Sequence, residues 1–227
     1  MPADITSAGA VPAGVTAIMH ALDGVLDPEL DQPITSLGFV ASCDLSPDGR
    51  ASVRLRLPTY FCAPNFAFMM VADAHDAVST VPGVRAADVR LEDHFAARDI
   101  NGAAAARTGN DLRALRMTFA RKAVLAGTDR VCRPLLAAGT GPAELAALTL
   151  ADLEPSPELD RLRRRRAELG LPAGAGAPLL IDPSTGAAVA AEQAAAHLRR
   201  ARTVRTGADA NASICTGMLA RRYQETE

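Results

Sequence analysis

The spacing of apolar residues changes from helical to alternating and back within the first hundred residues, and this change restricts the possible folds. Between Val15 and Leu26 apolar residues recur at helical spacing. We expect that helix to end at Asp27, because a residue that precedes proline avoids the helical conformation. Residues 36–57 contain two alternating apolar and polar runs on either side of the turn sequence Ser-Pro-Asp-Gly at 46–49. This arrangement predicts a β-hairpin.

The same kind of pattern continues for another forty residues. A helical segment is predicted over 64–80, with Pro64 suited to its first turn. An alternating run follows over 84–92, in which Val89 and Leu91 point inward. The order α-β-β-α-β predicts an α+β domain over residues 13–101, with helices packed on one face of a small sheet.

The remainder of the chain, residues 108–227, is predicted to form a second, mostly α-helical domain. The sequence "PLLIDPSTG" at 178–186 predicts a short strand and turn within it. We interpret this domain as a possible site of client docking. The expected helices cover 110–126, 128–138, 142–148, 157–169, 191–202 and 209–222.

Composition narrows the functional classes. Hydrophobic residues make up 48% of the 227 positions and charged residues 22%, as in a globular protein with a real core. No run approaches the ~20 apolar residues of a membrane span, and no secretory signal is visible, so we expect a cytoplasmic protein that binds no membrane. All basic residues except Lys122 are arginine, which suggests a GC-rich genome. With a pI near 6.1, we expect no nucleic-acid partner.

The four cysteines, at 43, 62, 132 and 215, are too far apart for a local metal knuckle. In a reducing compartment we expect free thiols. Cys43 falls on the inward face of the first hairpin strand, and Cys132 lies among apolar residues, so both are interpreted as core residues. Cys215 comes near the start of the last predicted helix and is kept as a candidate metal ligand.

Cys62 stands apart because it follows a strand and precedes Pro64. It should therefore lie at the N-terminus of the next helix, where the helix dipole favours the thiolate over the thiol. Thiolate is the form that binds iron or attacks an electrophile. The alternative is that Cys62 is only a small residue in a tight turn.

Four segments together resemble the small iron–sulfur cluster assembly-factor family, whose members are SufT- or PaaD-like. The resemblance covers only the N-terminal part, about residues 13–101. The four segments are "LDPEL" at 26–30, "ITSLGFV" at 34–40, "VRLRLPTYFCAP" at 53–64 and "VPGVRAADVRL" at 81–91.

This resemblance implies a non-enzymatic maturation factor with the α-β-β-α-β order. It maps the family's reactive cysteine onto Cys62 and its acidic-proline motif onto Asp27, Pro28 and Glu29, which become candidate cofactor-binding residues. Two departures are visible. Ala63 separates the cysteine from the proline that follows it directly in the family, and Phe95 stands where the family commonly has tryptophan.

The number of ligands limits what Cys62 can do alone. A [2Fe–2S] cluster needs four ligands, and Cys62 supplies one of them. We therefore expect a transient iron–sulfur cluster or iron, with no permanent cofactor. The other ligands would come from a second Cys62 in a homodimer, from further residues or from a client metalloprotein. His94, next to Asp93 after the third strand, is a candidate metal ligand, although a solvated loop histidine is the plainer interpretation.

The leading hypothesis is thus a maturation factor that works with assembly machinery and a client protein. By analogy with PaaD, that client would be a multicomponent oxygenase. The alternative is a thiol-dependent enzyme with Cys62 as nucleophile, which requires a nearby base, and His94 is the best placed histidine. The basic stretches at 161–166 and 197–205 are predicted as the surface that docks the client.

Overall fold

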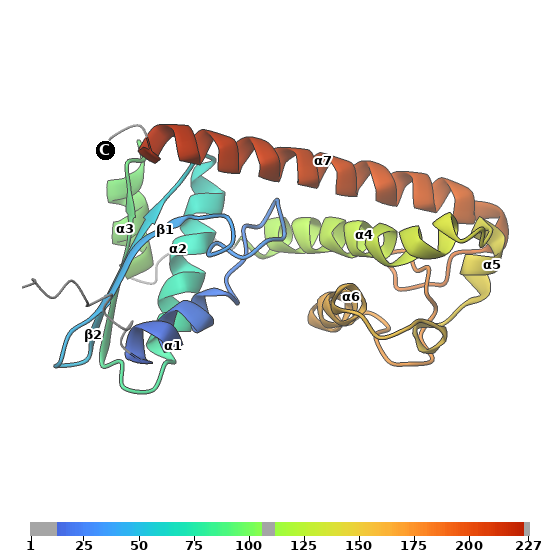
Figure 1. The fold of residues 1–227 in the computed structure, drawn as a ribbon, viewed down its shortest axis with the longest axis horizontal. Helices are drawn as coiled ribbons and strands as arrows, with labels where there is room; N and C mark the ends of the chain where they lie inside the picture. The colour runs from blue at the N-terminus through green and yellow to red at the C-terminus, as the bar shows by residue number, and fades with distance from the viewer. Residues whose placement is uncertain (1–12, 106–111, 225–227) are drawn as a thin grey trace, which may run out of the picture. The chain divides into compact units, whose positions relative to one another are not determined.

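The computed structural model describes residues 13–105 and 112–224 (Figure 1). The chain divides into two compact units. The sheet unit comprises Met1–Asp27, Gln32–Gly109 and Cys215–Glu227, and the helical unit comprises Pro28–Asp31 and Asn110–Ile214. The domain boundaries 13–101 and 108–227 stay a prediction, because these units are defined by contacts and are not continuous in sequence.

The sheet unit has the element order expected from the sequence, with one additional helix. Its three strands form one sheet in the order β1-β2-β3, with β1 and β2 antiparallel and β2 and β3 parallel. Parallel neighbours need a crossover connection, and α2 supplies it. The elements are α1 (Ala13–Leu22), β1 (Val40–Leu45), β2 (Arg50–Arg56), α2 (Pro64–Ser79), β3 (Ala86–Glu92) and α3 (Ala97–Ala105).

The hairpin turn is built by the residues that predicted it. The hydroxyl of Ser46 accepts a hydrogen bond from the Arg50 amide (3.0 Å), which closes the turn. Gly49 has a φ of +84° and lies so close to the backbone that a Cβ there would be 2.8 Å from the carbonyl oxygen of Gly83. Glycine alone tolerates both conditions, so the turn is specified locally.

One face of the sheet forms the core of this unit. Ala51, Val53 and Leu55 of β2 are buried, and so are Val89 and Leu91 of β3, as the alternation predicted. α1 and α2 also bury one side each; in α2 the buried residues are Ala67, Met69, Met70, Val71, Ala74 and Val78. This packing confirms the α+β class of the N-terminal part.

Three local predictions in this unit were wrong. α1 ends at Leu22, well before Asp27, and the intervening segment is held by turns such as the bond from the Val25 amide to the Leu22 carbonyl (3.0 Å). The first strand begins at Val40, and an irregularity between Val40 and Ser42 exposes Ala41. Cys43 pairs with Val53 on the core side but is only half-buried, because β1 is an edge strand.

A further difference is α3, which the alanine-rich sequence did not suggest. It is anchored by Asn101, whose side-chain oxygen accepts from the Leu91 amide (2.8 Å) and whose side-chain nitrogen donates to the Leu91 carbonyl (3.0 Å). The amide group thereby occupies the hydrogen-bonding positions that a further strand would use at β3. Ile100 and Ala104 bury the inner side of α3.

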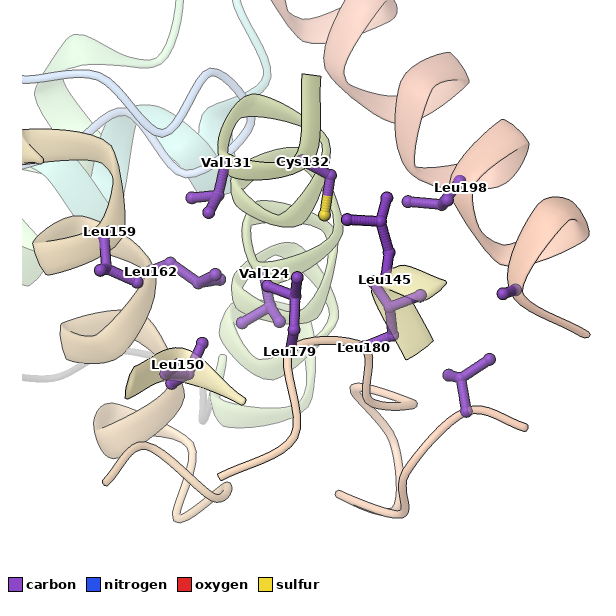
Figure 2. Close-up of a cluster of buried hydrophobic side chains, with 12 residues drawn as sticks. Val124, Val131, Cys132, Leu145, Leu150, Leu159, Leu162, Leu179, Leu180 and Leu198 are labelled. Atoms are coloured by element: carbon purple, nitrogen blue, oxygen red, sulfur yellow. The ribbon is translucent and has the colours of Figure 1, made fainter. Parts of the chain in front are cut away.

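The helical unit packs around one cluster of buried aliphatic side chains, shown in Figure 2. Val124, Val131 and Cys132 come from one long helix, and Leu159 and Leu162 come from a second that lies beside it. The mostly helical prediction for this part is confirmed. Its elements are α4 (Arg113–Ala137), α5 (Pro142–Ala147), the short 3-10 helix η1 (Leu150–Asp152), α6 (Pro157–Glu168) and α7 (Ala191–Gln224), the last of which extends into the sheet unit.

Two predicted helix breaks do not exist. α4 continues through Gly127, and α7 is one helix of 34 residues that continues through Gly207. The absence of a side chain at Gly127 has a packing reason, because a Cβ there would be 3.3 Å from Leu162 of α6. Instead of the strand expected over 178–186, the structure has two isolated bridges, Thr149 with Pro178 and Ile181 with Ala188.

The basic stretch of α6 is largely engaged inside its own unit. The Arg166 guanidinium is fully buried and donates to the carbonyl oxygens of Pro178 (2.8 Å) and Leu179 (2.5 Å). Burial lowers its pKa to about 10. Arg165 pairs with Asp31, and Arg163 donates to the Leu150 carbonyl (2.9 Å). These arginines hold loops in place, which weakens the prediction that residues 161–166 form a docking surface.

One arginine of the second basic stretch, Arg205, has a similar role. On α7, Arg205 donates to the buried carboxylate of Asp129 on α4 (2.5 Å). Asp209 accepts from both Arg205 (2.7 Å) and Arg130 (2.8 Å). A carboxylate as buried as Asp129 requires a cationic partner, so this network fixes α7 on α4 within the helical unit.

Candidate functional site

The candidate site lies where β2 and β3 end. Because the two strands are parallel, their carboxyl ends meet at the same edge of the sheet. The loop after β2, residues 57–63, carries Cys62, and the loop after β3, residues 93–96, carries His94. This edge is the usual place for a ligand in sheets with helical crossovers. Cys62 and His94, which are 32 positions apart in sequence, are therefore brought together.

Cys62 lies directly before the N-cap residue of α2. That N-cap is Ala63, which offers no side-chain hydrogen bond, and Pro64 begins the helix. The position that the sequence predicted for Cys62 is thus the one the structure shows. The residue is half-buried, and its sulfur lies 3.3 Å from the hydroxyl oxygen of Thr59. The thiol group consequently has one polar neighbour in its own loop, and the residue that carries it is partly exposed to solvent.

His94 is not a solvated loop residue, as the plainer interpretation held, because only 4% of it is exposed. Its Nδ1 accepts from the amide of Ala96 (3.2 Å), and its Nε2 lies 2.8 Å from the carbonyl oxygen of Cys62. Since Nδ1 is the acceptor, a neutral ring carries its proton on Nε2 and donates it to Cys62. The imidazole therefore ties the cysteine loop to the loop after β3.

Other bonds connect the same two loops. The Phe95 amide donates to the carbonyl oxygen of Tyr60 (3.1 Å). From the C-terminal end of α7, Arg222 donates to the carbonyl oxygens of Leu57 (3.1 Å) and Asp93 (2.7 Å). Sequence reasoning missed Arg222, which lies 129 residues beyond Asp93 and belongs to no motif.

Three aromatic side chains stand exposed around Cys62, and we call them the aromatic cluster. Tyr60 is 48% exposed, Phe61 76% and Phe95 51%. The ring of Phe61 lies 5.1 Å from that of Tyr60 and 5.8 Å from that of Phe95, measured between centroids. Aromatic groups this exposed are unusual on a monomer surface unless another molecule covers them. Phe95 had been predicted only as a substitute for a family tryptophan.

The remaining candidate ligands occupy varied positions, and their roles stay predictions. Asp27 is buried in the sheet unit, where its amide donates to the Gln32 carbonyl (2.9 Å). Glu29 is exposed and belongs to the helical unit, where it accepts from Asn211 (3.5 Å). Cys215 is half-buried within α7, far from the helix start at which it was expected.

The other two thiols fit a packing role. Cys132 is fully buried, as predicted, and burial together with Asp129 raises its pKa to about 12. Cys43 has a raised pKa as well, chiefly from partial burial and then from the neighbouring Asp44. Both environments disfavour the thiolate that iron binding requires.

No preformed metal cage exists in the described parts of the chain, since no three His, Cys, Asp or Glu side chains there are grouped to hold an ion. Over the same residues, no helix has the length and apolar character needed to cross a bilayer. In the described residues, the site thus offers one half-buried cysteine, Cys62, as a soft ligand.

Comparison with known proteins shows which family the chain belongs to. Residues 16–90 match the family model described as "Iron-sulfur cluster assembly protein". The chain is 32% identical over 74 residues to the Fe-S protein maturation auxiliary factor YitW of Bacillus subtilis, and the match covers 33% of this chain and 71% of YitW. This chain belongs to the iron–sulfur cluster assembly protein family. The residues that match the family model, 16–90, include Cys62 but neither His94 nor Arg222.

The chain is also similar over part of its length to two other proteins. An iron-sulfur cluster carrier protein of Mycobacterium tuberculosis is 41% identical over 76 residues, which are 34% of this chain and 19% of the carrier. An uncharacterized protein of Methanocaldococcus jannaschii, MJ1129, is 27% identical over 84 residues, 37% of this chain and 86% of that protein. This chain therefore spans only about a fifth of the carrier proteins that it matches. No solved structure matches it.

Proposed function

We propose that this chain is a maturation factor that receives an iron–sulfur cluster, or iron, through Cys62 and passes it to a client protein. The observation that carries the proposal is the placement of Cys62. This half-buried cysteine lies at the start of α2, inside the segment that matches the assembly family. The names of YitW and of the mycobacterial carrier protein support the same role.

The donor set at the site favours transfer over storage. Cys62 supplies one soft ligand, whereas a [2Fe–2S] cluster takes four. Both ring nitrogens of His94 are engaged, so iron would have to break one of those hydrogen bonds to bind there. The missing ligands would come from Cys62 of a second copy in a homodimer, from Asp27 or Glu29, or from the client. An incomplete ligand set makes the bound cargo easy to release.

The client would contact the aromatic cluster. Tyr60 and Phe61 belong to the loop that carries the thiol, and Phe95 belongs to the neighbouring loop. A protein whose ligands approach Cys62 would therefore also cover these rings. Burial of exposed aromatic area is a main source of affinity in protein interfaces. A narrower proposal, by analogy with PaaD, is that the client is a multicomponent oxygenase with iron-containing subunits.

An enzyme that uses Cys62 as nucleophile is the second candidate, and the geometry supports it less well. A nucleophilic thiol needs a base within hydrogen-bonding distance. The imidazole of His94 bonds to the backbone carbonyl of Cys62, and the thiol itself is next to the Thr59 hydroxyl, which is no base at neutral pH. We therefore favour a non-enzymatic role.

Anaerobic reconstitution with iron and sulfide tests the proposal. The wild-type chain should gain iron, sulfide and visible charge-transfer absorption, and Cys62→Ala should lose them. Cys43→Ala is the matched control, because Cys43 is also half-buried but lies on β1. Equal iron and absorption in wild type and Cys62→Ala would show that Cys62 does not hold the cargo.

A further inference from the structure

The end of α7 reaches the cysteine site through Arg222. Its two terminal nitrogens each donate to a different carbonyl, that of Leu57 at the end of β2 (3.1 Å) and that of Asp93 after β3 (2.7 Å). These carbonyls flank the two loops that carry Cys62 and His94. One guanidinium therefore bridges the points at which both loops leave the sheet.

The chemistry of this bridge requires arginine. A planar guanidinium presents several N–H groups in a fixed fork, so it can satisfy two acceptors in defined directions, whereas a lysine ammonium acts as a single point charge. The Arg222 guanidinium is also stacked near the ring of Tyr223, with 5.2 Å between its central carbon and the ring centroid. Arg56 of β2 lies over the same ring at 4.9 Å. The side chain is thus held in place from the sheet side as well.

The conformation of Asp93 shows that this point of the fold is constrained. Asp93 has a φ of +49°, in the left-handed region that residues with a side chain enter at an energetic cost. Such a conformation persists when neighbouring contacts over-determine it. The bond from Arg222 to the Asp93 carbonyl is one such contact. The turn that it maintains leads to His94, whose Nε2 lies within hydrogen-bonding distance of the Cys62 carbonyl oxygen.

We propose that Arg222 is a positioning residue for Cys62. By fixing the carbonyls of Leu57 and Asp93, it keeps the bonds from His94 to Cys62 and from Phe95 to Tyr60 in register, and so presents the thiol in one geometry. The expected consequence, efficient uptake of cargo by Cys62, rests on the proposed function. It also gives α7 a role at the site, although α7 lies outside the residues that match the family.

The test compares Arg222→Met with Arg221→Met. Arg221 is the adjacent, exposed arginine on the same helix, so its replacement removes the same charge without touching the loops. In the metal-free chain, Arg222→Met should speed hydrogen exchange of the Phe95 amide on the order of tenfold, as expected when a charge-assisted hydrogen bond is lost. Arg221→Met should leave it unchanged. Arg222→Lys should fall between Arg222→Met and wild type.

Cluster reconstitution then reports on function. At an unchanged melting temperature, Arg222→Met should take up less cluster than wild type and lose it faster to a chelator, and Arg221→Met should match wild type. If wild type takes up no cluster while Arg222→Met still accelerates Phe95 exchange, the proposed function fails and the positioning role stands. The inference would be overturned if Arg222→Met exchanged its Phe95 amide and took up cluster at the same rates as wild type. Should Arg222→Met not fold, Arg222→Lys decides by the same two measurements.

Discussion

Burial separates Cys132 from the other three cysteines, which are half-buried. The pKa of Cys132 is about 12, against an ordinary value of 9.0, because burial disfavours its charged form. The fraction of thiolate below the pKa falls tenfold for each pH unit, so at pH 8 only on the order of 10⁻⁴ of this thiol is ionised. Cys62 is half-open to solvent at a helix N-terminus, the environment of reactive cysteines.

We therefore predict that iodoacetamide at pH 8 labels Cys62 well before Cys132 in the folded chain. Peptide mass spectrometry at several reaction times measures the two rates in one sample. In strong urea both thiols should react alike, which provides the control for intrinsic reactivity. Labelling of Cys132 as fast as Cys62 in the folded chain would contradict the burial that the structure shows.

The residue scale also shows what the sequence could predict about the site. The position of Cys62 followed from the strand before it and Pro64 after it, both of which are local signals. The contact of His94 with Cys62 required knowing that β2 and β3 are parallel neighbours, and alternation alone does not determine the order of strands. Arg222 carried no signal at all, because the contact depends on where a 34-residue helix ends.

At the scale of elements, α4 and α6 approach each other closely at Gly127. A Cβ at this position would be 3.3 Å from the Cδ1 of Leu162, whose side chain is buried in the core of the helical unit. Gly207, in α7, is exposed, and a Cβ there would meet nothing within 4 Å. Two glycines in helix interiors thus have opposite packing environments.

This contrast predicts opposite effects of adding a side chain. Gly127→Val should lower the free energy of unfolding by roughly 1–3 kcal/mol, because the added methyl groups overpack the core. Gly207→Ala should raise it by about 0.5–1 kcal/mol, since alanine stabilises a helix interior and has free space here. Urea unfolding followed by circular dichroism measures both. A stabilising Gly127→Val would show that α4 and α6 are not in close contact.

The two glycines also explain where the sequence interpretation of the helical unit was wrong. Breaks were predicted near 127 and 203–208, and a glycine in each of these places weakens a helix on its own. Tertiary contacts outweigh that preference: Leu162 packs against α4 at Gly127, and the Asp129–Arg205 pair holds α7 next to Gly207. β2, β3 and α2 were predicted well because period, turn residues and proline all agreed there.

At the scale of the whole molecule, α7 belongs to both compact units. Its residues up to Ile214 are part of the helical unit, and those from Cys215 onward are part of the sheet unit. In the sheet unit this end of α7 supplies Arg222 and also Leu219. Leu219 lies close to Gly38, because a Cβ added at Gly38 would be 3.3 Å from the Cδ2 of Leu219. The sheet unit therefore depends on residues made at the end of the chain.

A chain that ends after Ile214 should reveal this dependence. We predict faster hydrogen exchange in loops 57–63 and 93–96 of the truncated chain and unchanged exchange in the α6 core of the helical unit. A chain that ends after Gln224, and so keeps Arg222, is the matched control and should behave as wild type. Equal acceleration in both units would mean that the truncation destabilises the molecule globally, against the local role proposed for the end of α7.

The contact between Arg222 and Asp93 also has a consequence for synthesis on the ribosome. The two residues are 129 positions apart, and Arg222 and Leu57 are 165 apart. Translation at about 5–20 residues per second therefore exposes the cysteine loop for several seconds before its arginine has been made. A nascent chain shorter than 222 residues lacks the two hydrogen bonds of Arg222, so under the proposed function cargo delivered during translation would meet a cysteine loop that is not yet fixed. The proposed function therefore places cargo uptake after residue 222 has been made.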